Sequence, residues 1–301
     1  MRSAAVRVTR SCSCLGAMAC LLCGLAWPQN GATPLPHPDD ETITDGVYVS
    51  KYFDLSYPLL PGWTKGMAGP GPSHLGYYVL STLMPANQQR AIMLITAQDM
   101  FFAPAAFRGA TAMTHEIGRA VSKIEGMTLD RPPSEEMIAG RPFSRIDFSG
   151  VGLFRSTLTT QIRCHLVSFN IMANSPDLLA ELVLSLDKLG RTDEGSGRAA
   201  DPICKPHEGL TKHLLTRVDP PAIAPFTPIP VRIIIDAGGS VKHVHVIRAT
   251  PDQRTGIEAA LGKWRFGQLE DGTVELETGL LIEFTPAGAV KYLSGDQAPP
   301  F

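Results

Sequence analysis

The 301-residue sequence has little net charge and no long hydrophobic run outside its N-terminal segment. Its formal net charge is −2, and charged residues make up only 19% of the chain. Without an excess of Lys and Arg, no global electrostatic argument favours nucleic-acid binding. No segment beyond the N-terminus approaches the roughly 20 apolar residues of a membrane-spanning helix. What remains, with 44% hydrophobic residues, is a globular composition and a length sufficient for two domains.

Common catalytic signatures are also missing. The sequence has no Gly-x-Ser-x-Gly segment, so this signature of a serine nucleophile is absent. Residues 69–72, GPGP, alternate Gly with Pro and offer too few free N–H groups for a phosphate-binding loop. We therefore expect a protein that is not an enzyme and that carries no cofactor and no metal ion.

The N-terminal segment has the pattern of an export signal. Three arginines within the first ten residues precede an uncharged, mostly apolar run at residues 11–27. This pattern predicts a secretory signal peptide over residues 1–27 and hence a periplasmic or secreted protein. A retained signal anchor in the inner membrane is the alternative. Lipid attachment at Cys20 is less favoured, because the apolar run continues past that cysteine.

Cysteine is scarce after this segment. Four of the six cysteines lie within residues 1–27, which leaves Cys164 and Cys204. An even number of cysteines in an oxidising compartment favours a disulfide between them. Two separate buried thiols are the alternative.

The remaining chain predicts an α+β protein with two domains. Residues 28–45 lack hydrophobic periodicity and are expected to form a disordered leader, and residues 46–190 form an antiparallel α/β sandwich. Residues 191–220 are a polar and proline-rich linker. A small domain follows at residues 221–286, and a tail at residues 287–301.

Residues 46–190 resemble the PsbP-like α/β sandwiches. The resemblance rests on the opening phrase YFDLSYPLLPGW at residues 52–63, on central antiparallel strands, and on a Leu-rich helix after Ser175 and Pro176. Serine at the N-cap and proline at the first helical position are typical of a helix start. The resemblance implies an accessory or binding module.

Residues 221–286 predict a β-hairpin, a helix and a further strand. The segments VRIIIDAGGSVKHVHVIRAT, IEAALGKWRFGQLEDGT and LLIEF carry this order, and together they resemble the TonB C-terminal domain. The helix ends in Lys-Trp-Arg-Phe, and we expect Trp264, Phe266 and Gly272 to have structural roles. A core position for Trp264 is at least as well supported as a direct partner contact.

The TonB resemblance implies a periplasmic sheet that binds another protein. In that family the last strand region pairs with a segment of an outer-membrane transporter, which is strand addition to an exposed edge. The corresponding edge here is residues 274–284, and its candidate partner-binding residues are Val274, Leu276, Thr278, Leu280, Ile282 and Phe284. We therefore expect an exported cell-envelope protein that binds a protein partner. An envelope hydrolase or ligand-binding protein that uses the N-terminal domain is the alternative, and a purely structural envelope protein is a third possibility.

Two histidine-containing segments can be considered as metal sites. Residues 37–41, HPDDE, match the zinc motif of LmbE-like deacetylases, but no apolar strand precedes them, so a catalytic zinc site is not expected there. His243 and His245 are two residues apart on a predicted strand and share one face of it. No third ligand is evident near them in the sequence, which favours a polar sheet face over a metal site.

Overall fold

The computed structural model describes residues 36–87, 90–104, 108–192, 202–221, 228–268, 275–285 and 287–294. The predicted signal peptide lies outside these residues, and so does the first part of the predicted leader. Within the described residues, no helix is long and apolar enough to cross a membrane. The described residues belong to one compact unit and form the mixed α+β fold that the sequence predicts.

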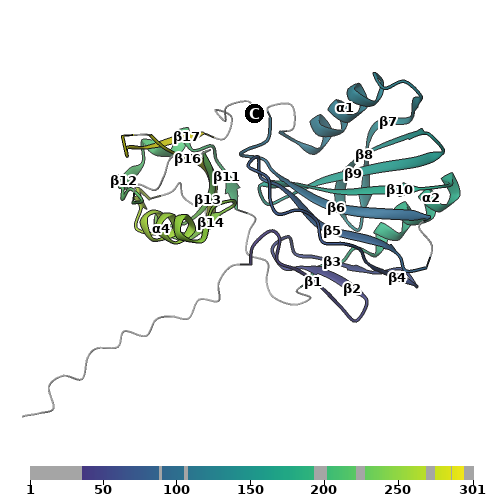
Figure 1. Cartoon of the computed structure of the whole chain (residues 1–301), viewed down its shortest axis with the longest axis horizontal. Coiled ribbons are helices and arrows are strands. Elements are labelled where there is room, and N and C mark those ends of the chain that lie inside the picture. The colour runs from purple at the N-terminus through teal and green to yellow at the C-terminus, as the bar shows by residue number, and fades with distance from the viewer. Residues whose placement is uncertain are drawn as a thin grey trace, which may run out of the picture. The chain divides into compact units, whose positions relative to one another are not determined.

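The N-terminal half is built from two antiparallel sheets (Figure 1). A three-stranded sheet contains β1 (Glu41–Thr44), β2 (Val47–Ser50) and β3 (Leu55–Pro58). A seven-stranded sheet has the order β4-β5-β6-β10-β9-β8-β7. Its strands are β4 (Trp63–Lys65), β5 (Tyr77–Pro85), β6 (Ala91–Asp99), β7 (Met127–Ile138), β8 (Arg141–Gly150), β9 (Leu153–Ile162) and β10 (His165–Ala173).

Two helices pack on opposite faces of the large sheet. Helix α2 (Pro176–Ser185), which a 3₁₀ turn at Leu186–Lys188 extends, covers the apolar face that carries Phe143 and Phe169. Helix α1 (Ala110–Val121) packs over Ile146, which points to the other face because side chains alternate along a strand. The N-cap of α2 is as predicted, since the Ser175 hydroxyl accepts a hydrogen bond from the Leu178 N–H at 3.3 Å.

The predicted leader is partly ordered, which corrects the expectation for residues 41–45. Strand β1 pairs with β2 along its whole length. The turn between them is Asp45-Gly46, and both residues have positive φ values, 52° and 73°. Asp-Gly is the preferred sequence for such a tight hairpin turn. The four-residue strand is too short to produce a recognisable period.

The C-terminal half has the predicted order of hairpin, helix and strand. Strands β13 (Ile229–Asp236) and β14 (Val241–Val246) form the hairpin, followed by α4 (Pro251–Leu261), the short β15 (Arg265–Phe266) and β16 (Glu275–Phe284). The start of α4 is a capping box in which Thr250 and Gln253 exchange side chain to main chain hydrogen bonds. Together, α4 and one face of the sheet enclose a second apolar core.

The predicted linker and tail also contribute secondary structure. The linker holds β11 (Ile203–Cys204), α3 (Glu208–Thr211) and β12 (Leu214–Thr216), and the tail holds β17 (Val290–Ser294). The sheet has the order β11-β16-β13-β14, and β17 also pairs with β16. Strand β12 pairs separately with β15.

Strand β16 is not an exposed edge, so that part of the partner-binding prediction is wrong. One side of β16 pairs with β13 from Glu275 to Ile282. The other side pairs with β11 at Leu276 and Glu277 and with β17 from Leu280 to Phe284. Five of the six predicted contact residues are buried: Leu276, Thr278, Leu280, Ile282 and Phe284. Val274 lies outside the described residues.

Trp264 is part of the core. This is one of the two roles considered from the sequence, the other being a direct partner contact. Its side chain is 1% exposed, and its Nε1–H donates to the Val218 carbonyl at 2.9 Å. Its ring meets those of Phe266 and Tyr292. Phe266 is buried as well, whereas Gly272 lies outside the described residues.

Candidate functional site

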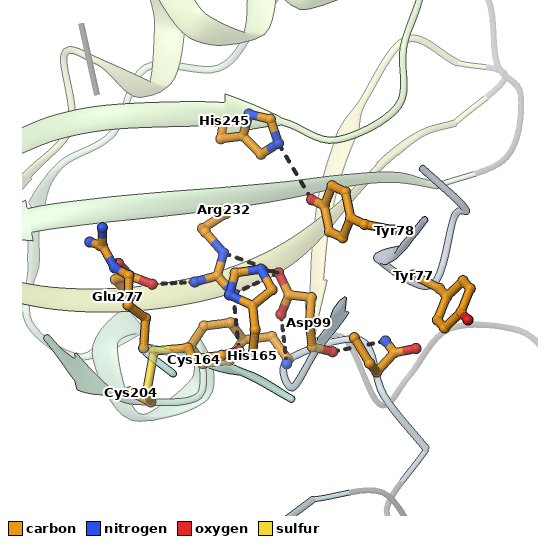
Figure 2. A network of polar contacts seen from close by, with 12 residues as sticks. Tyr77, Tyr78, Asp99, Cys164, His165, Cys204, Arg232, His245 and Glu277 are labelled. Carbon is orange, nitrogen blue, oxygen red and sulfur yellow. Dashed lines mark hydrogen bonds and ion pairs between the residues drawn. A yellow bond between two sulfur atoms is a disulfide. The ribbon is translucent and has the colours of Figure 1, made fainter. Parts of the chain in front are cut away.

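A buried polar network joins the N-terminal and C-terminal sheets (Figure 2). Arg232 on β13 bonds Asp99, at the end of β6, with Nη2 to Oδ2 at 2.7 Å and Nε to Oδ2 at 3.0 Å. The same guanidinium contacts Glu277 on β16 and donates to the Cys164 carbonyl at 3.2 Å. Arg232 is 1% exposed, and both carboxylates are 0% exposed. A charged side chain in such a place must have partners, and here strands β6 and β16 and the turn before β10 supply them.

Burial and ion pairing shift the pKa values of these charged groups in opposite directions. Burial raises the pKa of Asp99 above its usual range, although Arg232 opposes the shift. Burial alone would lower the pKa of Arg232, but the carboxylates of Asp99 and Glu277 outweigh it and raise that pKa. The guanidinium therefore stays charged at any ordinary pH.

The disulfide lies beside this network. Cys164 and Cys204 are bonded, with Cα atoms 5.7 Å apart, as the sequence predicts. Next to it, Arg163 reaches Glu277 at 2.5 Å and stacks over the Tyr52 ring at 4.7 Å. The disulfide and the charges thus hold β11 and β16 against the N-terminal sheet at one point.

His165 follows Cys164 in the sequence and is fully buried. Neither of its ring nitrogens has a hydrogen-bond partner among the described residues, and Asp99 is 3.8 Å from Nε2. Rings of Tyr52, Phe53 and Tyr78 surround it edge-on. Burial, together with the charge of nearby arginines, lowers the pKa of His165 well below its usual value. It is therefore a neutral ring in the core.

Above the network, β14 forms an edge of the C-terminal sheet. The Ile247 N–H donates to the Pro230 carbonyl on β13 at 3.0 Å. Because main-chain groups alternate in direction along an antiparallel strand, those of Val244 and Val246 face away from β13. Arg254 on α4 caps the Val246 carbonyl at 2.9 Å. No described strand pairs with this side of β14.

A pocket lies along the same edge. It is lined by His37, Val241, Lys242, His243, Val244, Glu258 and Gly262. Strand β14 has a bulge between its pairings at His243 and Val241. The bulge turns Val241 toward the apolar core, whereas strict alternation would place it on the histidine face. Lys242 in the bulge is exposed and contacts Glu275.

Three histidines meet beside this edge. His243 and His245 share a face of β14, as predicted, and His37 approaches from the segment that precedes β1. One ligand nitrogen from each lies within 4.8 Å of the others. The His37 ring meets that of His245 edge-on, with centroids 4.3 Å apart, and that of His243 at 5.7 Å. The third histidine, which the sequence does not reveal, comes from the HPDDE segment.

His245 is the most enclosed of the three. It is 4% exposed, and its Nδ1 has no hydrogen-bond partner among the described residues. Its Nε2 lies 3.4 Å from the Tyr78 hydroxyl (Figure 2). Burial, with the neighbouring His37 and Arg232, lowers the pKa of His245 to about 2. The ring is therefore neutral, which is the state in which imidazole binds metal ions.

Comparisons with known proteins assign no family. No protein-family model matches the sequence, and no curated protein sequence matches it. Among solved structures, cyanobacterial PsbP (CyanoP) from Synechocystis sp. PCC 6803 is 11% identical, covering 48% of this chain and 91% of that chain, with a TM-score of 0.36. A crystal structure from Bacteroides thetaiotaomicron VPI-5482 is 14% identical, covering 54% of this chain and 52% of that chain, with a TM-score of 0.31. Neither is described as a TonB domain, so the TonB resemblance stays a prediction.

Proposed function

We propose that this protein is an exported, non-enzymatic protein of the cell envelope that binds an extended segment of a protein partner along the outer edge of β14. The observation that carries the proposal is the side of β14 that has no strand partner among the described residues, where the main-chain groups of Val244, a residue that is 8% exposed, face away from β13. A partner strand at such an edge gains main-chain hydrogen bonds, and pockets along it select side chains.

The surroundings of the edge support this choice over β16. The pocket beside β14 is bounded by Glu258 and Gly262 on the α4 side and by His37 on the other. Lys242, which is paired with Glu275, and Glu258 line this pocket, so polar side chains of an extended segment would meet polar groups there. The edge of β16, in contrast, is filled by the chain's own β11 and β17.

The hydrolase alternative has less support. The buried carboxylates of Asp99 and Glu277 are bound to Arg232, and Arg163 takes the second oxygen of Glu277. A general acid or base needs a proton that it can exchange with a substrate. Carboxylates held in this way serve to join the two sheets.

Site-specific photocrosslinking in the envelope tests the proposal. A photoreactive residue replaces Lys242 on β14 in the full chain, and a matched variant carries it at Lys291, which is exposed on β17 at another edge of the same sheet. We expect one dominant adduct from position 242, with the crosslink mapped by mass spectrometry to an extended partner segment. No adduct at 242, or the same adducts from both positions, would refute the proposal. Fractionation of the tagged chain tests export separately.

A further inference from the structure

We propose that His37, His243 and His245 form a binding site for a divalent transition-metal ion such as Zn²⁺, Cu²⁺, Ni²⁺ or Co²⁺. This goes beyond the proposed partner binding and does not depend on it. Three imidazoles converge from two parts of the chain that are separated by some two hundred residues, and their ligand atoms lie within 4.8 Å of one another.

The geometry is close to what coordination requires. Metal–nitrogen bonds of about 2.0–2.1 Å at tetrahedral angles place ligand nitrogens about 3.3 Å apart. The observed group therefore has to contract by at most about 1.5 Å, which side-chain rotation at the two half-buried residues, His37 and His243, can supply. Imidazole ligands suit zinc, copper and nickel, whereas magnesium and calcium prefer oxygen ligands.

His245 provides an independent indication. Its buried Nδ1 is an unpartnered polar atom, and such atoms are costly in a folded protein. A metal ion at Nδ1 would satisfy it. The other nitrogen, Nε2, then donates its hydrogen to the Tyr78 hydroxyl, 3.4 Å away. Metal-bound histidines usually donate their second N–H to such an outer partner, which fixes the ring.

The backbone around His37 is held in a fixed conformation. Pro36 and Pro38 flank the residue, and a proline restricts the backbone of the residue before it to extended conformations. The His37 N–H donates to the Asp40 carboxylate at 2.7 Å, and its carbonyl accepts from the Asp40 N–H at 3.0 Å. These bonds hold a turn from which the imidazole reaches β14.

Nearby positive charge does not exclude a cation. Of the guanidinium groups near the histidines, Arg163 and Arg232 are each paired with a buried carboxylate, and Arg254 donates to the Val246 carbonyl. The pocket beside His37 and His243 leaves a side open for water or another ligand, so the site is of the three-protein-ligand type.

The experiment uses the full mature chain without a polyhistidine tag, titrated with Co²⁺ and Zn²⁺ at neutral pH. We expect one ion per chain by calorimetry and, for Co²⁺, the visible absorption of a low-coordinate nitrogen site. His37→Ala should weaken binding by about 100-fold or more, because changing only an outer partner of a ligand already costs about 10–100-fold. Tyr78→Phe should fall within that smaller range.

The control is His115→Ala, an exposed histidine on α1 away from the cluster, which should bind the ion like the unmodified chain. His37 lies outside every strand, so thermal unfolding in the presence of a chelator should be similar for His37→Ala and the unmodified chain. Binding that survives His37→Ala, or no saturable binding of either ion, would overturn the proposal. No partner is present in this experiment, so its failure would leave the strand-pairing proposal untouched.

Discussion

Replacing Arg232 by Met should reveal how much the buried network contributes to stability. In this variant Glu277 keeps Arg163, 2.5 Å away. Among the described residues, the Asp99 carboxylate keeps the hydrogen bond from the Phe101 N–H, at 2.9 Å from Oδ1, and the neutral His165 ring lies 3.8 Å away without bonding it. Removing one partner of a buried ion pair typically costs about 3–5 kcal/mol, because the other charge stays buried and unpaired.

The cost of protonating Asp99 gives a second estimate of the lost stability. Asp99 can escape the cost of an unpaired charge by staying protonated, and at pH 7 holding a proton on an acid of ordinary pKa 3.9 costs about 4.2 kcal/mol. That figure is an upper limit for this part of the loss, and it agrees with the range for broken pairs. At pH 5 the same calculation leaves only about 1.5 kcal/mol. The folded variant binds a proton that the unfolded chain lacks, so its stability relative to the unmodified chain falls as pH rises.

Urea unfolding, monitored by tryptophan fluorescence at pH 7 and at pH 5, measures the loss of stability at each pH. The double variant Arg232→Met with Asp99→Asn should recover most of the loss at pH 7, since no unpaired carboxylate then remains at position 99. A loss below about 1 kcal/mol at pH 7 would show that the pair is not buried as described. An equal loss at both pH values would show that Asp99 does not control it.

Three further predictions concern other parts of the fold. Replacing Cys164 and Cys204 by Ser should cost about 4 kcal/mol in the chain-entropy estimate for a separation of 40 residues, measured by urea unfolding against the oxidised chain. Because burial lowers the pKa of His165, the folded state resists protonation there, and this residue alone should account for a loss of about 1.3 kcal/mol of stability between pH 7 and pH 5.5. His165→Phe should lose less over that interval, and an equal loss would assign the effect to other groups. Gly239→Ala should cost about 1–3 kcal/mol in thermal unfolding, because φ is +82° and a Cβ would collide with the Phe266 carbonyl oxygen; an unchanged melting temperature would contradict the turn geometry.

Local sequence patterns predicted much of the architecture. The hairpin, the helix before Trp264 and the cap at Ser175 each arise from residues close together in the chain, where periodicity and capping chemistry act. The disulfide could be predicted because two cysteines, an even number, remain in a chain that is expected to reach an oxidising compartment. Strand β11 could not be predicted in the same way, because two residues form no period and their pairing with β16 depends on the distant Cys164.

The candidate sites are formed by residues that lie far apart in the sequence, so their contacts could not be predicted from it. His37 could be recognised as a possible ligand, but only the tertiary fold brings it to His243. Arg232 carried a usable signal, since it is the single charge between Ile229 and Ile235 of β13 and so requires a buried acid. The sequence does not say which acid, because Asp99 and Glu277 both lie far along the chain from it.

The joining of the two sheets through Arg232 also has a consequence for synthesis. All strands of the large N-terminal sheet, including β6 with Asp99, precede β13 in the chain. Until Arg232 arrives, the carboxylate has no guanidinium partner and is best accommodated in water, so that end of β6 should remain open. In a chain that has emerged only as far as β10 this corner would then be hydrated, and docking of the last third would expel that water. A nascent chain stopped before residue 232 should therefore be more accessible to proteases at this corner than at the opposite edge.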